Sequence, residues 1–188
     1  PSGTSTTCTG GTITAVSSSS VVSYTGGMVA AGAVCTVTVQ VRSSAPGSLV
    51  NTTGDLTSSL GNSSTATATL VVEPPPTFNK AFATNPVELF TPVTLAFTIN
   101  NSGSSTAATG LSFTDQLPTE LVIADPSGAS TTCTGGTLTA TPGASVVSYT
   151  GGTVAGGATC ELEVSVVGVD SGSLVNTTGA LTSSLGSS

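Results

Sequence analysis

An internal repeat dominates this sequence. The segment PSGTSTTCTGGTIT that begins at Pro1 returns as PSGASTTCTGGTLT at Pro126, 125 residues later, and the match continues without a gap. Further along, GSLVNTTG occurs in the same register, first from Gly47 and then from Gly172. A period of this length is too long for one turn of a solenoid and fits one β-sandwich of about seven to nine strands. The sequence therefore predicts tandem domains, each built from one repeat.

Apolar and polar side chains alternate along several segments, which is typical of β-strands because successive side chains point to opposite faces. The apolar rows expected to face a core are Val93, Leu95, Phe97 and Ile99, then Cys160, Leu162, Val164 and Val166, and in the first copy Cys35, Val37, Val39 and Val41. Gly-Gly pairs at 10–11, 26–27, 135–136 and 151–152 are predicted to be turns. The excess of Ser, Thr, Gly and Val favours strands and turns throughout, so the predicted fold class is all-β.

Three consecutive prolines at 74–76 mark the predicted domain boundary. We predict that residues 1–72 are the later part of one repeat, residues 73–76 a stiff proline-rich linker, and residues 77–188 a complete repeat. The first copy lacks a counterpart of residues 77–125, and half a sandwich leaves its apolar face bare. Either the chain is a window on a longer polymer, which we favour, or the missing strands come from a neighbouring subunit.

Composition argues against several classes of function. The chain has no His, only two basic residues (Arg42 and Lys80) and a net charge of −7, so we expect no His-based catalytic triad and no transition-metal site. Nucleic acids and anionic membrane surfaces both attract clustered Lys and Arg, so neither partner is expected. No apolar run reaches the roughly 18 residues of a membrane-spanning helix. No cofactor or metal is predicted, calcium included, because Asp115, Glu120 and Asp125 are dispersed.

Four cysteines occur as two pairs with the same spacing in each copy, Cys8 with Cys35 and Cys133 with Cys160. We predict a disulfide within each pair, because evenly spaced repeated pairs in a chain of this composition are typical of secreted proteins. Each bond would stabilise its domain by about 3 to 4 kcal/mol on the chain-entropy estimate. The alternative is a reduced, buried thiol that packs as a small hydrophobic group.

The lone lysine, Lys80, shares its strand face with Phe78 and Phe82 and is therefore expected to point inward. Asp115 shares the inward face of Leu111 and Phe113, and Asn176 that of Leu174. Buried charges must be paired or neutralised. One hypothesis explains all three polar residues: an autocatalytic isopeptide bond from Lys80 to Asn176, with a neutral amine as nucleophile, a protonated Asp115 polarising the amide, and ammonia as leaving group.

A plainer interpretation is a buried or edge salt bridge between Lys80 and Asp115, with Asn176 only a turn residue. Asp115 could also cap the turn that follows it, and Glu88 is a weaker candidate for the acid. Asn51 occupies the position of Asn176 in the first copy, but the matching lysine would lie before Pro1.

A family resemblance rests on motifs in this order: FNKAF around Lys80, LAFTINN around Asn100, FTDQLP around Asp115, TTCTGG around Cys133 and LVNTTG around Asn176. Together they resemble the conserved repeat domain of large bacterial and archaeal surface proteins, a family of unknown function. The resemblance covers nearly all of residues 77–188, and residues 1–72 as a truncated copy. It implies immunoglobulin-like sandwiches arrayed in tandem outside the cell. One departure is the segment ELFT at 88–91, where such domains often have a glycine turn.

These observations predict a structural repeat of an extracellular or cell-surface stalk, fibre or filament rather than an enzyme. Its expected partners are neighbouring repeats or copies of the same protein, including a head-to-tail polymer with strand complementation. The rival function is an adhesin-type module that recognises glycan or protein through its loops. Asn-x-Ser/Thr sequons make Asn51, Asn62 and Asn100 candidate glycosylation sites.

Overall fold

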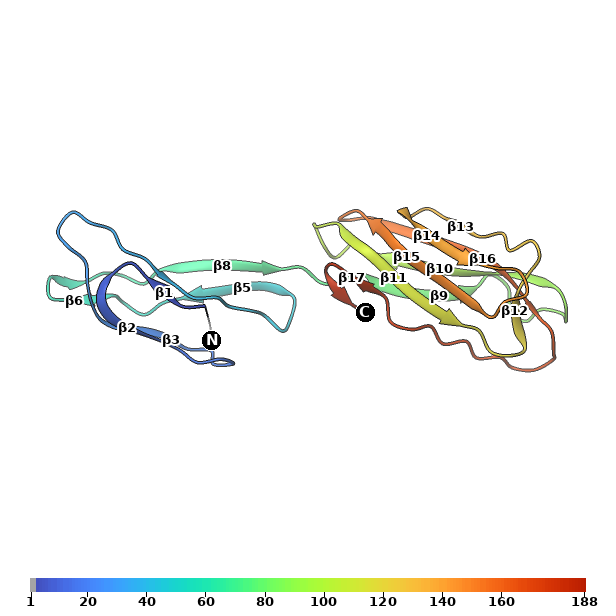
Figure 1. The fold of residues 1–188 in the computed structure, drawn as a ribbon, viewed down its shortest axis with the longest axis horizontal. Coiled ribbons are helices and arrows are strands. Elements are labelled where there is room, and N and C mark those ends of the chain that lie inside the picture. The colour runs from blue at the N-terminus through green and yellow to red at the C-terminus, as the bar shows by residue number, and fades with distance from the viewer. Residues whose placement is uncertain (1–2) are drawn as a thin grey trace. The chain divides into compact units, whose positions relative to one another are not determined.

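We describe residues 3–188 in a computed structural model. All regular elements in this range are β-strands, so the predicted all-β class is confirmed. The described range contains no helix that is long and apolar enough to cross a membrane. The strands are drawn in Figure 1. They belong to two compact units, residues 1–44 and residues 45–188, and each unit is described by itself. The predicted division at the prolines, between residues 72 and 77, does not coincide with this one and stays a prediction.

Two five-stranded sheets form the sandwich of the second unit. The first sheet has the order β12 (Leu121–Ile123), β16 (Thr159–Gly168), β10 (Pro92–Asn100) and β9 (Thr77–Phe82), with β13 (Ser130–Thr131) also paired to β16. The second has the order β14 (Thr134–Ala140), β15 (Val146–Val154), β11 (Ala108–Gln116), β17 (Thr182–Ser183) and β18 (Gly186–Ser187). Every pair is antiparallel.

The core of this unit lies between the two sheets and follows the predicted alternation. All of Val93, Leu95, Phe97 and Ile99 on β10, and of Cys160, Leu162, Val164 and Val166 on β16, are buried. The two rows are cross-strand neighbours on the same face of the first sheet, with Leu95 opposite Val164 and Phe97 opposite Leu162. The second sheet contributes Leu111, Phe113, Val147 and Tyr149. Burial of these apolar side chains is the main stabilising contribution to a sandwich of this kind.

Two hairpins precede the sandwich within the same unit. β5 (Gly47–Thr52) pairs with β8 (Thr67–Val72), and between them β6 (Thr57–Ser58) pairs with β7 (Gly61–Asn62). Residues 73–76 then join β8 to β9 without regular structure. Glu73 is anchored there, because Ser105 donates its hydroxyl to Oε1 at 2.5 Å and its backbone N–H to Oε2 at 3.2 Å.

The first unit contains two short strand pairs. β1 (Ser5–Thr6) pairs with β4 (Val37–Thr38), and β2 (Thr9–Ala15) pairs with β3 (Val22–Met28). The row predicted to face a core here is not buried: Cys35 and Val39 are partly exposed, Val37 and Val41 are exposed, and the strand covers only two residues. Alternation alone does not bury a row, because a second sheet has to cover it.

The Gly-Gly pairs are not turns, and that prediction is wrong. All four lie inside strands, in β2, β3, β14 and β15, where Gly10 is opposite Gly27 and Gly135 is opposite Gly152. Two of these glycines, Gly136 and Gly152, make room for a tyrosine: a Cβ at Gly152 would overlap the Tyr149 hydroxyl, and one at Gly136 would lie 2.7 Å from it. Tyr149 donates that hydroxyl to Gly135 O at 2.9 Å, and burial raises the pKa of its phenol.

Candidate functional site

A buried carboxylate stands at the centre of the candidate site. Asp115 lies on β11 with 0 % of its surface exposed. Three side chains donate hydrogen bonds to it: Lys80 Nζ to Oδ1 at 3.0 Å, Thr178 Oγ1 to Oδ1 at 2.8 Å, and Asn176 Nδ2 to Oδ2 at 2.7 Å. The structure therefore places Lys80, Asp115 and Asn176 together, with the acid between the amine and the amide. It shows the Lys80–Asp115 ion pair and no covalent bond between Lys80 and Asn176.

Lys80 reaches Asp115 from the opposite sheet. It lies on β9, directly opposite Phe97 on β10, and its side chain is 14 % exposed. Nζ lies 6.0 Å from the centroid of the Phe97 ring, at the outer limit of a cation–π contact. Phe78, Phe97 and Phe113 form a contiguous aromatic cluster, with ring centroids of Phe113 at 4.8 and 4.9 Å from the other two. This apolar environment increases the cost of holding a charged amine.

Asn176 and Thr178 come from the segment between β16 and β17. Thr178 forms an isolated backbone bridge with Asp115, and Gly179 donates its N–H to Thr114 O at 3.0 Å, so the segment is tied to the edge of β11. Asn176 directs its amide nitrogen at Asp115, while its Oδ1 is buried without a hydrogen-bond partner. A buried unpaired acceptor costs about 1 to 3 kcal/mol. Turning the amide over would bring Oδ1 to Asp115, where a protonated carboxyl group could donate to it.

Thr178 is a member of this site that sequence reasoning missed. The signal was present, because Thr178 stands two residues after Asn176 and therefore shares its face in an extended segment. Glu88, the weaker candidate for the acid, is exposed in the loop before β10 and does not take part. In the same loop Phe90 has φ 59°, the left-handed conformation that favours glycine.

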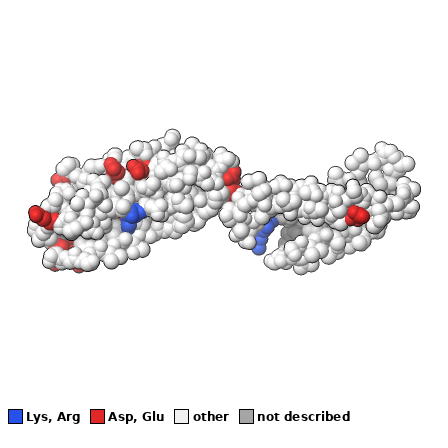
Figure 2. All heavy atoms as spheres, turned by 180° about the vertical axis from the view of Figure 1, so that it is seen from behind, with Lys and Arg blue, Asp and Glu red and all other residues white. Residues whose placement is uncertain are grey.

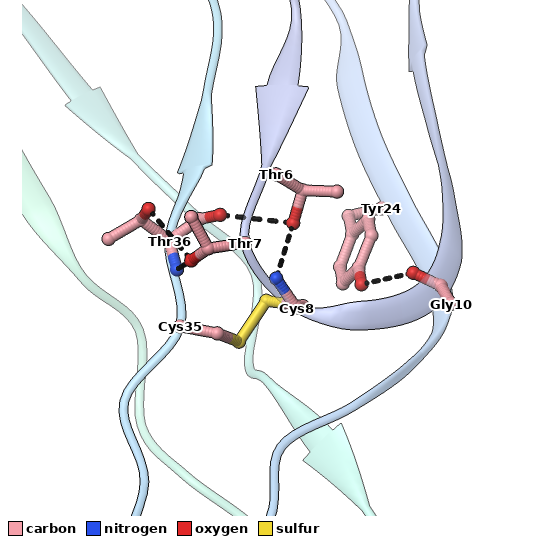
Figure 3. The surroundings of a disulfide bond; sticks show 7 residues. All are labelled: Thr6, Thr7, Cys8, Gly10, Tyr24, Cys35 and Thr36. Carbon is pink, nitrogen blue, oxygen red and sulfur yellow. Dashed lines mark hydrogen bonds between the residues drawn. A yellow bond between two sulfur atoms is a disulfide. The ribbon is translucent and has the colours of Figure 1, made fainter.

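Both predicted disulfides are present. Cys8 and Cys35 are joined with their Cα atoms 4.8 Å apart, and Cys133 and Cys160 with theirs 4.9 Å apart. Figure 3 shows the first bond with the threonines beside it. There Thr6 Oγ1 accepts the Cys8 N–H at 3.0 Å and Thr7 Oγ1 accepts the Thr36 N–H at 2.8 Å.

The second copy repeats this local arrangement at Thr131, Thr132 and Glu161. In each copy the disulfide therefore belongs to the same small hydrogen-bonded unit. No free cysteine remains among the residues that the structure describes.

Charged side chains elsewhere are few. Figure 2 shows one face on which acidic groups lie singly on a largely uncharged surface. Within residues 3–188 there is no group of three or more His, Cys, Asp or Glu side chains placed to hold a metal ion. Of the sequon residues, Asn51 and Asn62 are exposed, and Asn100 is partly buried with its Oδ1 accepting the Ser102 N–H at 2.8 Å.

Comparison with known proteins gives one family. The sequence matches the family described as "Domain of unknown function (DUF7933)" over residues 1–72 and again over residues 76–188. No curated protein and no solved structure matches it.

Proposed function

We propose a structural role for this chain, which belongs to the DUF7933 family of domains of unknown function: it is a repeat of an extracellular stalk, fibre or filament and performs no enzymatic turnover. In this proposal the repeat is held together by its disulfides and by an isopeptide bond between Lys80 and Asn176. The single observation that carries it is Asp115, fully buried and hydrogen-bonded to the amine and to the amide at once.

The bond forms in one condensation. A proton first passes from Lys80 Nζ to Asp115 along their 3.0 Å hydrogen bond, which replaces two buried charges by two neutral groups. The Asn176 amide turns over, and the carboxyl group of Asp115 donates to its Oδ1. Nζ then attacks Cγ, and the excess proton on nitrogen passes through Asp115 to Nδ2. The Cγ–Nδ2 bond breaks, ammonia leaves, and the new amide joins Lys80 Nζ to Asn176 Cγ.

The bond would connect the two ends of the sandwich. Lys80 belongs to the first strand of residues 77–188, and Asn176 follows the last long strand, β16. Force applied through the chain on either side of residues 77–188 would therefore pass across this covalent bridge and would not peel β9 from β10. A cross-link of this kind suits a module that has to stay folded under tension.

The extracellular part of the proposal is supported by the disulfides. Bonds of this type persist in oxidising compartments and are rare where thiols are kept reduced. The resemblance of the motifs around Lys80, Asp115 and Asn176 to repeats of surface proteins agrees with this location. Tandem copies of one domain would extend a stalk by one module each.

Intact mass of the reduced protein tests the cross-link. Release of one ammonia lowers the mass by about 17 Da relative to the sequence. Asn176→Ala should have its full sequence mass, because no amide carbon is available to the lysine. The matched control is Asn51→Ala, at the same position of the first copy, which should keep the loss. A wild-type mass equal to that of the sequence would rule out the bond.

A further inference from the structure

One long edge of the second sheet has no strand beside it. β14 stands at the end of the strand order, and among the residues that the structure describes its only strand partner is β15. Its seven residues, TGGTLTA, include no charged side chain and no proline. An edge of this kind leaves a row of backbone N–H and C=O groups free to pair with another chain. β14 is therefore available for strand addition.

The strands at the other ends of the two sheets are protected. β12 and β18 are short, with three and two residues. β9 is longer, but it follows three prolines and carries Lys80, whose ammonium points inward to Asp115. Shortness, proline and an inward charge are devices that keep a sheet edge from pairing. β14 has none of these three, so within residues 3–188 it is the edge of the sandwich best suited to strand addition.

The free edge is a property of the repeat. In the first copy β2 has the sequence of β14 except for Ile13 in place of Leu138, and its only described strand partner is β3. The residues that follow the first copy are present, and β8 among them pairs with β5 and leaves β2 free. The strand that precedes β14 is present as well, and β13 pairs with β16. The segments on either side of the repeat therefore do not cover this edge.

Charge decides which partner fits the edge. The chain has a net charge of −7, and exposed acids such as Glu161 and Glu163 lie on the outer face of the first sheet. Two copies repel each other where such carboxylates meet, and they meet no carboxylate on β14. A basic segment of another protein would gain nothing from an edge without acids. The partner that fits is therefore a second copy of this chain.

The sequence of β14 is also complementary to itself. An antiparallel pair centred on Leu138 places the two leucines opposite each other and each Thr137 opposite Thr139 of the other copy. Leu138 is only partly buried and packs against its own core, so the two leucines would cover each other on the inner face. The exposed threonines would form cross-strand pairs on the outer face. Both faces of the pair are thus matched.

We propose that β14 is a self-association edge, at which two copies of the chain join their second sheets through an antiparallel β14–β14 pair around Leu138. The contact is small, so one pair binds weakly, with a dissociation constant on the order of 1 mM. Several repeats in one chain would add such contacts and hold neighbouring chains side by side. This lateral contact goes beyond the proposed role of a single repeat under tension, and it does not depend on the Lys80–Asn176 bond.

The test measures association of the full chain by sedimentation equilibrium at concentrations up to about 3 mM. We expect the mean mass to rise toward twice that of one chain. The edge-facing amides of Thr137–Ala140 should exchange with deuterium about threefold more slowly at the highest concentration than in dilute solution, because two-thirds of the chains are then paired.

Two charged variants test the pairing itself. One combines Thr137→Lys with Thr139→Lys, and the other combines Thr137→Asp with Thr139→Asp; all four changes are at exposed positions. Each variant alone puts like charges opposite one another and should stay a monomer. An equimolar mixture puts opposite charges together and should associate at least as strongly as wild type.

The matched control combines Thr109→Lys with Thr114→Lys, two exposed positions on the central strand β11 of the same sheet. It should associate as wild type does, and a loss here would mean that copies pack face to face, against the proposal. A monomeric wild type at about 3 mM would also overturn it. So would a charged β14 variant that associates normally, or a mixture that associates no better than its components. Intact mass of each sample reports on the Lys80–Asn176 bond separately.

Discussion

Thr178 and Asp115 are joined twice, through a backbone bridge between β11 and the segment after β16 and through a 2.8 Å hydrogen bond from the threonine hydroxyl to Oδ1. The hydroxyl and the Lys80 amine share that oxygen. The second oxygen of the carboxylate is left to Asn176. Thr178 therefore fixes the direction in which the carboxylate presents its two oxygens.

Replacing Thr178 by Val should destabilise the domain by about 2 kcal/mol, because a buried carboxylate loses one of three donors while the side-chain volume is nearly kept. Thr178→Ser keeps the hydroxyl and should cost much less. Chemical denaturation followed by circular dichroism measures both. Equal stabilities for the two variants would show that the hydroxyl does not support Asp115.

Replacing Asp115 by Asn should abolish the loss of ammonia, because an amide cannot relay the proton from Lys80 to the leaving group. The same change leaves a partly buried ammonium without its counter-charge, so we expect a loss of about 3 kcal/mol in stability. Intact mass and denaturation give the two readouts on one sample. Glu161→Gln, which removes an exposed acid from β16, is the control and should keep the mass loss. If Asp115→Asn still lost ammonia, this carboxylate would be excluded as the proton relay.

The alternation of apolar and polar residues predicted which side chains of this site point inward, but it did not predict how the strands that carry them are arranged. Phe78, Lys80 and Phe82 fall on one face of a strand, as do Leu111, Phe113 and Asp115, so the sequence alone indicates an inward amine and an inward acid. The contact between Lys80 and Asp115 was hypothesised because buried charges must be paired, whereas alternation does not show that β9 and β11 belong to opposite sheets. That pairing depends on the order of strands within each sheet, which is a property of the whole fold.

The glycines show where local rules are misleading. Gly-Gly is a good turn signal, because glycine adopts the left-handed conformation at little cost. Here Gly135, Gly136 and Gly151 do have positive φ, at 65°, 77° and 79°, but within paired strands. Of these three, only Gly136 lies where a Cβ would meet the Tyr149 hydroxyl, at 2.7 Å, and a contact between residues on two strands cannot be read from a dipeptide.

Replacing Gly152 by Ala should destabilise the second unit by about 2 to 3 kcal/mol, because the added methyl group would overlap the Tyr149 hydroxyl and the ring is fully buried. Gly27→Ala makes the same change beside Tyr24, whose ring is partly exposed and can move aside, so its cost should be smaller. The control is Gly168→Ala, where the nearest atom to the new Cβ is 3.9 Å away; we expect a change of about 0.5 kcal/mol or less. Thermal unfolding compares the three. If Gly152→Ala and Gly168→Ala lost similar amounts of stability, steric exclusion of a Cβ by the Tyr149 hydroxyl would be contradicted.

The attachment of Glu73 to the sandwich should depend on pH. The Ser105 hydroxyl, with a further contribution from the Ser105 backbone N–H, lowers the pKa of the Glu73 carboxyl below its ordinary 4.5. Because the folded pKa is the lower one, this contact stabilises the folded chain above about pH 4.5, and the contribution is lost as the pH falls through the folded value.

Ser105→Ala should raise the Glu73 pKa toward its ordinary value, and an NMR titration of the side-chain carboxyl measures the shift. In wild type we expect the amide resonances of residues 73–76 to change over the same pH range as the carboxyl, since protonation weakens the bonds that hold this segment. Ser102→Ala removes a neighbouring serine that does not contact Glu73 and should leave the titration unchanged. An unaltered midpoint in Ser105→Ala would mean that Ser105 does not hold the segment between β8 and β9 in place.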